Sequence, residues 1–509
     1  MSRLFSGLIA VTLLSGVPLR ADYVTPGSGV RWTLDSLVVY SEGAVAGDSG
    51  YFEVSETVIV ANGDTLVMAP GDSLVVLGSG AAVTLEINGA LDAVGSESDS
   101  IRVTAALGQP DAWYGLRYRD TGPGSFFRLR YASVEFARRA VDVVGADAEV
   151  EDCRIAHSQE VAVDLSASNS LIRNNHIVDN RQRAIQMTLS SAPLIEGNVL
   201  RRNNLEDSSP YNFISIGLQG VNSPRIVGNH IVGGVQRSGG ISIWANSQAV
   251  IEANRIENCA FGILCFQPGA NPLIRGNTIV NNTVNPDTAL YGFAIASNGA
   301  NRPIVSENRI SGHFYGVAII NGGQPVLGDL GNLDTRDDGG NFFLGNGIGS
   351  NRYEVFNNNS LSIKAENNWW GTADADSIAA RIVDQSDNPQ YGPVDYDPFM
   401  TDTVMVAIAG ETGVLPSAGF EIAGAWPNPF NPAVNLTVRL GRSMMLEGAV
   451  HDVLGRRVRD LGSRFLVAGE HAWRWDGRGD GGGAVASGWY VIRISGEGGS
   501  AARRVLLVR

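Results

Sequence analysis

Short runs of alternating apolar and polar residues fill the middle of the chain, and Gly, Asn and Pro separate them. A period of two is the strand pattern, because successive side chains of a β-strand point to opposite faces. Within these runs Ile-x-x-Asn-x-Ile recurs at intervals of 23, 31, 25, 23 and 31 residues. Its asparagines are Asn175, Asn198, Asn229, Asn254, Asn277 and Asn308. A unit of this length cannot bury a core alone, so we predict that the copies stack into a solenoid.

The asparagine column has a physical role in such a stack. Coiling would place equivalent residues of successive turns about 4.8 Å apart. At that spacing the asparagine side chains can hydrogen-bond to one another and to the turn backbone as a ladder. Ala132 and Cys153 occupy the same register on earlier turns, and Asn341 and Asn368 on later ones. The pattern therefore predicts an all-β fold with a parallel β-helix of about twelve turns over residues 23–400.

Both ends of this region resemble those of a known group of solenoids. Ala69-Pro70-Gly71-Asp72 and Ile87-Asn88-Gly89-Ala90-Leu91 look like opening turns, and Asn367-Asn368-Trp369-Trp370-Gly371 looks like a closing turn. With the repeat, they resemble the right-handed parallel β-helix proteins of the pectate-lyase-like superfamily. The resemblance implies a right-handed solenoid. It leaves the activity open, because lyases, hydrolases, epimerases and adhesins share this architecture.

A second module follows a predicted linker at residues 401–420. Residues 421–509 contain short alternating runs at Val434–Leu440, Leu446–Val453 and Ala502–Val508, with turn residues between them. This spacing predicts a small immunoglobulin-like β-sandwich. Pro427-Asn428-Pro429-Phe430-Asn431-Pro432 and Trp475-Asp476-Gly477 resemble the C-terminal sorting domain of type IX secretion substrates and the immunoglobulin-type domain of the flagellar hook assembly protein. The resemblance implies contact with secretion or cell-surface machinery, and a plain structural cap is the alternative.

The N-terminus predicts export. Arg3 precedes an apolar run, Leu4–Val17, and small residues follow near Ala21, so residues 1–22 match a secretory signal peptide. We expect a secreted or cell-surface protein with no membrane span in the mature chain, because no later run is long enough. The formal charge is −14, and the acidic excess lies before residue 421. Nucleic acid is therefore not an expected partner.

The three cysteines, Cys153, Cys259 and Cys265, are an odd number for an exported protein. We therefore predict buried free thiols rather than a disulfide framework. A bridge between Cys259 and Cys265 is the alternative.

The search for catalytic chemistry gives no assembled acid/base pair. Asp337-Asp338 resembles the paired aspartates of galacturonan hydrolases, but no Gly-His-Gly follows, and Gly312-His313-Phe314 lacks the second Gly. No cofactor is certain. Ca²⁺ is one prediction, because carboxylates crowd a Gly-rich loop and supply the oxygen ligands that this ion prefers. These carboxylates are Asp329, Asp334, Asp337 and Asp338. Ordinary turn chemistry is the alternative explanation.

Two 31-residue turns carry insertions, Asn204–Phe213 and Asn282–Tyr291. Between them, alternation points Trp244 and Phe266 outward on neighbouring turns. We expect Gln219 and Thr188 to continue this strip on earlier turns, and Ala296 and Ile320 on later ones. With Tyr211 and Tyr291 in the flanking loops, the strip predicts a surface that stacks on sugar rings. In the alternative, the loops merely cover the strip.

We therefore expect a non-catalytic protein that binds an extracellular polysaccharide. Two other functions stay open. One is a polysaccharide lyase or hydrolase, and the other is a surface spacer without a ligand.

Overall fold

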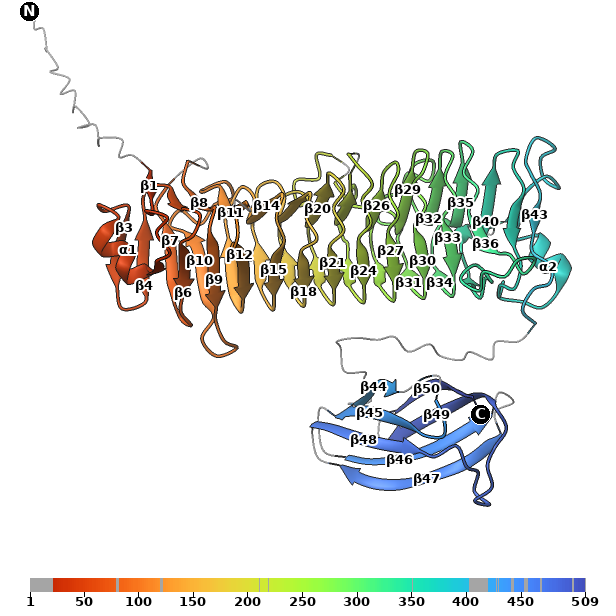
Figure 1. The fold of residues 1–509 in the computed structure, drawn as a ribbon. Helices are drawn as coiled ribbons and strands as arrows, with labels where there is room; N and C mark the ends of the chain where they lie inside the picture. Colours follow the sequence, from red (N-terminus) through yellow and green to blue (C-terminus); the bar gives the residue numbers. More distant parts are fainter. Residues whose placement is uncertain are drawn as a thin grey trace, which may run out of the picture.

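The computed structural model describes residues 22–508 except 79–81, 120–121, 210, 218, 350, 402–419, 427, 429, 441–443, 453–455, 467–468 and 497–498. The predicted signal peptide therefore lies, apart from Asp22, outside the described residues, as does nearly all of the predicted linker. From Tyr23 to Asp395 the chain forms a right-handed parallel β-helix (Figure 1). Each turn passes through three sheets, here called A, B and C.

Sheet A has 14 strands. They are β1 (Tyr23–Val24), β5 (Val58–Val60), β8 (Thr84–Ile87), β11 (Gly115–Arg119), β14 (Val141–Val144), β17 (Val163–Ser166), β20 (Ile185–Thr188), β23 (Ile214–Ile216), β26 (Ile241–Ile243), β29 (Ile263–Phe266), β32 (Phe293–Asn298), β35 (Tyr315–Ile320), β40 (Val355–Asn358) and β42 (Ile382–Val383).

Sheet B also has 14 strands. They are β2 (Arg31–Thr33), β6 (Thr65–Met68), β9 (Ala90–Val94), β12 (Phe126–Arg130), β15 (Ala148–Glu151), β18 (Leu171–Arg173), β21 (Leu194–Glu196), β24 (Arg225–Val227), β27 (Val250–Glu252), β30 (Leu273–Arg275), β33 (Ile304–Ser306), β36 (Val326–Gly328), β41 (Ile363–Ala365) and β43 (Val394–Asp395).

Sheet C has 13 strands. They are β3 (Val45–Asp48), β4 (Tyr51–Val54), β7 (Ser73–Val76), β10 (Ile101–Ala105), β13 (Ala132–Glu135), β16 (Arg154–Ala156), β19 (His176–Val178), β22 (Val199–Arg201), β25 (His230–Val232), β28 (Arg255–Glu257), β31 (Thr278–Val280), β34 (Arg309–Ser311) and β37 (Phe342–Leu344). A two-stranded hairpin, β38 (Gly347–Ile348) and β39 (Asn351–Arg352), follows the last of them.

The repeated motif forms the corner between sheets B and C. In one turn Ile172 on β18 and Ile177 on β19 point inward and are fully buried, and Asn175 lies between them. The residue before the asparagine adopts a left-handed conformation, with φ 54° at Asn174. Glycine takes that position in several other turns, as at Gly228 with φ 64°, because it adopts this conformation without steric cost. The inward isoleucines and the left-handed residue at the corner together set the register of each turn.

The six predicted asparagines form a continuous ladder along this corner. In each of the five steps the side-chain Nδ2 donates to the Oδ1 of the next asparagine at 2.9 or 3.0 Å. The ladder goes on through Asn341 to Asn368. At its other end the backbone N–H of Cys153 donates to Asn175 Oδ1. All eight asparagines are at most 1% exposed, so the ladder satisfies polar groups that the solenoid buries.

Both ends of the solenoid are closed by elements that break the repeat. At the first turn α1 (Leu34–Tyr40) begins at the N-cap Thr33 and buries Leu34 and Leu37, while β3 pairs antiparallel with β4. At the last turns α2 (Ala375–Ala379) begins at the N-cap Asp374. These elements cover strand edges that would otherwise pair with another chain.

The C-terminal region consists of two antiparallel sheets. One contains β44 (Phe420–Trp426), β45 (Val434–Leu440) and β48 (Gly469–Trp475), and the other β46 (Met444–Asp452), β47 (Arg457–Leu466), β49 (Gly488–Gly496) and β50 (Gly499–Leu507). The two sheets share a core that includes Trp473 and Ile492, so the region is a small β-sandwich. The run predicted at Val434–Leu440 is β45, residue for residue.

Candidate functional site

Trp244 and Phe266 lie next to each other at the downstream edge of sheet A, as the alternation predicts. Their ring centroids are 4.7 Å apart with an interplanar angle of 75°, and both side chains are half-buried. The strand register corrects their predicted neighbours. Since Ile243 pairs with Ile216 and Phe266 with Asn298, Gly217 and not Gln219 lies beside Trp244. Asn298, and not Ala296, follows Phe266.

The prediction failed at these two positions because the long insertions shift the start of the following strand relative to the asparagine. Thr188 and Ile320 lie in the predicted column. Gln219 lies beyond it, in a turn after β23, and is exposed.

The two insertions do not flank the Trp244–Phe266 pair. Both lead into the upstream ends of sheet A strands, β23 and β32, whereas the aromatic pair lies at the downstream ends of β26 and β29. A strand of three or four residues, about 10–13 Å, separates the two edges. The predicted walls and the predicted strip are therefore on opposite edges of one sheet.

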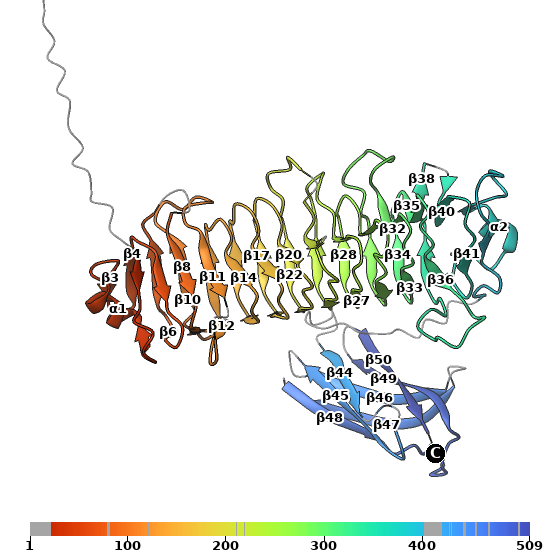
Figure 2. The same ribbon diagram turned by 45° about the horizontal axis from the view of Figure 1, so that its top comes forward.

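Loops rise from one edge of the solenoid in Figure 2. Hydrogen bonds join the two insertions with the loop before β26 at the upstream edge of sheet A, and we call this group the loop lobe. Its members are the described residues of 204–213, 233–240 and 282–291. The Oδ1 atoms of Asp207 and Asn212 accept from the backbone N–H groups of Arg237 and Gly239 at 2.8 and 3.2 Å. Asn285 Nδ2 donates to Gln236 O at 2.9 Å. These bonds link the three segments to one another, so the lobe forms one continuous surface.

The two predicted tyrosines differ in their surroundings. Tyr211 packs its ring under the guanidinium of Arg183, whose Cζ lies 4.1 Å from the ring centroid. Tyr291 is half-buried, and its backbone N–H donates to Asp287 O at 3.0 Å. Only Tyr211 therefore contacts the charged residues described next.

Two carboxylates lie on the outer face of sheet A on neighbouring turns, where sequence reasoning did not expect them. Asp142 on β14 pairs in register with Asp164 on β17, and the residues are 3% and 4% exposed. Tyr114 Oη donates to Asp142 Oδ2 at 2.8 Å, and Arg117 Nε lies 3.2 Å from the same oxygen. Burial raises the pKa of Tyr114, and the charge of Asp142 adds to that shift.

Asp164 has its own set of partners. Arg139 Nη1 donates to Asp164 Oδ2 at 2.9 Å, and Gln186 Nε2 donates to Oδ1 at 3.3 Å. Arg139 Nε reaches Glu160 at 2.8 Å. Burial raises the pKa of Asp164, and the neighbouring Asp142 raises it further, while Arg139 lowers it. We call this group the charged cluster: Tyr114, Arg117, Arg139, Asp142, Glu160, Asp164, Arg183 and Gln186.

Aromatic side chains follow on the later turns, in the strands of sheet A and in the segments next to them. Phe261 stacks on Phe293 with centroids 5.1 Å apart, and Phe293 pairs in register with Tyr315. Tyr315 stacks on Tyr353 at 5.5 Å, and both contact Phe356. Tyr391 extends the group beyond Phe356 at 6.4 Å. We call these six residues the aromatic row; all but Phe261 are half-buried. Sheet A thus presents charge on its early turns and aromatic rings on its late turns.

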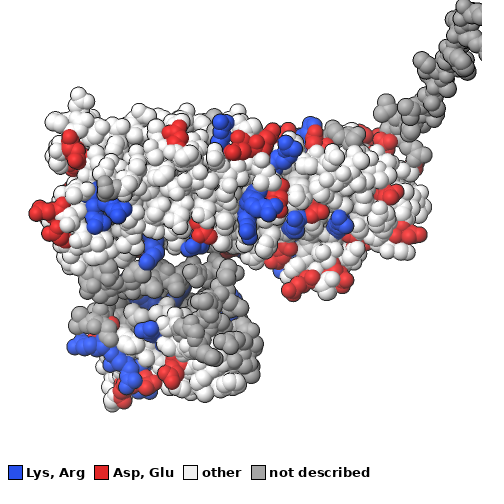
Figure 3. Space-filling view, turned by 180° about the vertical axis from the view of Figure 1, so that it is seen from behind, with Lys and Arg blue, Asp and Glu red and all other residues white. Residues whose placement is uncertain are grey.

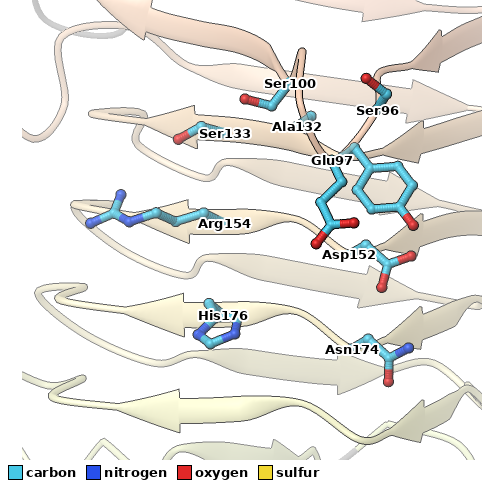
Figure 4. Close-up of a pocket in the computed structure, with 10 residues that line it drawn as sticks. Ser96, Glu97, Ser100, Ala132, Ser133, Asp152, Arg154, Asn174 and His176 are labelled. Atoms are coloured by element: carbon cyan, nitrogen blue, oxygen red, sulfur yellow. The ribbon is translucent and has the colours of Figure 1, made fainter. Parts of the chain in front are cut away.

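Sheet C carries a shallow groove of about 420 Å³ (Figure 4). Ser133, Arg154 and His176 line it from three successive strands, and the loop at Glu97 overhangs one end. Arg154 is already paired with Glu135, and Asp152 accepts from Arg130 Nε at 3.2 Å. Most of the charge in this groove is therefore neutralised within the chain.

Acidic and basic side chains are interspersed on the solenoid face seen in Figure 3. This matches the many ion pairs between neighbouring turns, such as Arg173 with Glu151 and Glu196. No helix among the described residues has the length and hydropathy needed to cross a membrane.

The predicted calcium loop is shaped mainly by its own contacts. Arg336 donates to Asp334 and holds the pKa of that carboxyl at about 2, while Asn332 donates to Asp337. Asp329 accepts from Gly331 N at 3.1 Å. In the part of the chain that the structure describes, no three His, Cys, Asp or Glu side chains gather as metal ligands, so Asp338 and its neighbours form no such group.

The cysteines and the histidine singled out in the sequence are structural. Cys153, Cys259 and Cys265 are buried free thiols, and burial raises the pKa of each. His313 is 1% exposed and sits in a second polar ladder between Asn282 and Asn346. Burial lowers the pKa of His313 to about 4.

Residues 127–291 match the family described as periplasmic copper-binding protein (NosD). This span covers less than half of the chain. None of the curated proteins matches the sequence. Similar solved structures include the Dettilon tailspike protein (gp208), with a TM-score of 0.39 and 12% identity over 87% of this chain and 73% of that one.

The periplasmic alginate epimerase AlgG has a TM-score of 0.39 and 13% identity over 73% of this chain and 81% of that one. An alginate lyase from Paenibacillus sp. str. FPU-7 has a TM-score of 0.28 and 15% identity, over 64% and 98%. Likenesses of this size carry no conclusion about activity.

Proposed function

We propose that this protein is an exported, non-catalytic β-helix that binds an extended extracellular polysaccharide along the outer face of sheet A. The observation that carries the proposal is the aromatic row. Aromatic rings on successive turns, all half-buried except the buried Phe261, offer stacking faces to consecutive sugar rings. Phe293, Tyr315 and Phe356 belong to the sheet A strands β32, β35 and β40, so the row extends along the stacked turns and suits an extended chain.

Trp244 and Phe266 add a second stacking point on the same sheet, at its downstream edge. This places the binding surface across the sheet rather than between two loop walls. The loop lobe borders the surface at the upstream edge.

The charged cluster favours binding over cleavage. A catalytic acid or base must reach the bond that breaks, but Asp142 and Asp164 are almost completely buried beneath their own partners. Their contacts orient Arg117, Arg139 and Tyr114. A lyase or hydrolase is therefore the second candidate, favoured only by the proximity of these two carboxylates.

Copper binding is not part of the proposal. The family that matches residues 127–291 is described as copper-binding, but the described residues contain no group of three His, Cys, Asp or Glu side chains that could hold an ion. Each of the three thiols is fully or almost fully buried, so the donor set does not fit such an ion.

Export and attachment complete the proposal. The predicted signal peptide, and the periplasmic description of the matching family, support export. We assign contact with secretion or cell-surface machinery to the sandwich at residues 421–509, on the strength of its sequence motifs. Deleting this sandwich should leave glycan binding unchanged and remove the protein from the cell surface.

A glycan array probed with the mature chain, with product analysis, tests the proposal. Tyr315→Ala should weaken retention of the best glycan about 10-fold, as expected for one lost stacking contact of about 1.4 kcal/mol. Tyr51→Ala is the matched control, because Tyr51 is an exposed tyrosine on sheet C. Shortened products would establish the enzyme, and absence of retention on a broad array would favour the spacer.

A further inference from the structure

Arg183 differs from the other arginines of the charged cluster in its partners. Arg117 lies against Asp142, and Arg139 against Asp164 and Glu160. Among the described residues, Arg183 makes no ion pair. Its guanidinium instead lies over the Tyr211 ring, with Cζ 4.1 Å from the ring centroid, and burial lowers its pKa.

The position of Arg183 is fixed from two sides. It precedes β20 by two residues at the upstream edge of sheet A, and its backbone carbonyl accepts from Ala162 N at 3.1 Å. The loop lobe supplies Tyr211 on the outer side. A guanidinium stacked in this way keeps its N–H donors directed outward in its own plane, ready for a planar or tetrahedral anion.

The buried carboxylates do not neutralise this group directly. The charge of Asp164 acts on Arg183, but both Asp164 oxygens already accept, from Arg139 and from Gln186. Among the described residues, the cluster thus leaves the guanidinium of Arg183 beside an aromatic ring without a carboxylate partner. A partly desolvated cation without a partner is costly unless a ligand supplies the counter-charge.

We propose that Arg183 and Tyr211 form a subsite for an anionic substituent, a carboxylate or a sulfate, of the bound glycan. The inference rests on the proposed function and names its ligand class as an acidic polysaccharide. Arg183 pairs with the anionic group, and the outer edge of Tyr211 borders the sugar ring that carries it. Asp164 and Glu160 accept from Arg139, so the charge of Arg139 is already paired within the chain.

Paired ligands separate this subsite from the rest of the binding face. De-esterified and fully methyl-esterified oligogalacturonides share one backbone and differ in the carboxylate. Carrageenan oligosaccharides and their desulfated counterparts do the same for sulfate. Titration calorimetry of the full mature chain should show at least a 10-fold preference for the anionic member of one pair, and that pair identifies the anion.

Arg183→Gln should reduce this preference to less than about 3-fold, with the affinity for the uncharged member unchanged. One charge-assisted pair is worth a factor of this order. Arg181→Gln is the matched control, because Arg181 is an exposed arginine two residues away with no side-chain partner among the described residues. Circular dichroism checks that both variants fold.

Two results would overturn the inference in different ways. Equal affinity of the wild type for both members of each pair would remove the anion subsite and leave glycan binding intact. No binding of any of the four ligands would count against the subsite and the proposed function together.

Discussion

Replacing Asn229 tests how much of the solenoid's stability comes from the asparagine ladder. Its Oδ1 accepts from the backbone N–H and from the Nδ2 of Asn198, both at 2.9 Å. Its own Nδ2 donates to Asn254 Oδ1 and to Ile195 O, both at 2.9 Å. A fifth, longer bond joins Nδ2 to Val227 O at 3.2 Å. Asn229→Ala removes all five contacts from a site that is 1% exposed, where water cannot replace them.

The magnitude follows from the groups left behind. The backbone N–H of Asn198 loses its acceptor, and an orphaned buried donor costs about 1–3 kcal/mol. Asn198 Nδ2 keeps Ile172 O as an acceptor, so its loss is smaller. Adding about 1 kcal/mol for each remaining net hydrogen bond, we expect the free energy of unfolding to fall by about 3–5 kcal/mol.

Guanidinium unfolding followed by circular dichroism measures the total loss, and amide hydrogen exchange locates it. Turns next to Asn229 should lose protection first, because each turn of a solenoid contacts only its neighbours. Asn169→Ala is the control, since Asn169 is exposed and its side chain makes no hydrogen bond with a described residue. A change of less than about 0.5 kcal/mol for Asn229→Ala, equal to the control, would refute the reasoning.

Two further predictions concern buried groups elsewhere. Burial lowers the pKa of His313 to about 4, so the unfolded state binds the proton first, and stability should fall by about 3 kcal/mol as the pH drops from about 6.5 to about 4. His313→Asn should remove this pH dependence in denaturant titrations at pH 7 and 4.5. If the variant loses as much stability between these two pH values as the wild type, His313 is not the titrating group. The thiols of Cys153, Cys259 and Cys265 should not react with a thiol reagent in the native state, because burial raises their pKa values, and all three should react in guanidinium. Fast reaction of any one thiol without denaturant would contradict the buried geometry.

The solenoid could be predicted because its sequence repeats the same physical requirement on every turn. An inward isoleucine on each side of a corner asparagine, as at Ile172 and Ile177, satisfies burial and corner geometry within six residues. Such a local rule is visible without knowing which turns are neighbours. The outward alternation of Trp244 and Phe266 is local in the same way, and the structure places the two rings together.

The charged cluster could not be found by the same means. Asp142 and Asp164 belong to the runs Val141–Val144 and Val163–Ser166, where an outward aspartate is expected to meet solvent. They are buried because Tyr114, Arg117 and Arg139 reach them across turns, and no single run carries that information. Tyr211 was singled out as a loop residue, but its partner Arg183 comes from the preceding turn. An outward Asp at the same strand position in two consecutive turns is the one signal that an aligned repeat would have shown.

The caps at the two ends carry a consequence for how this protein can change length. The first turns are closed by α1 and β3 and the last by the segment around α2, while every interior turn meets its neighbours through the same corner. Duplicating one interior unit, such as residues 254–276, would therefore insert a turn without exposing a new edge. Each duplication would lengthen the outer face of sheet A by about 4.8 Å. The length of polymer that the sheet A face can span is therefore set by the number of repeat units in the gene rather than by any single residue.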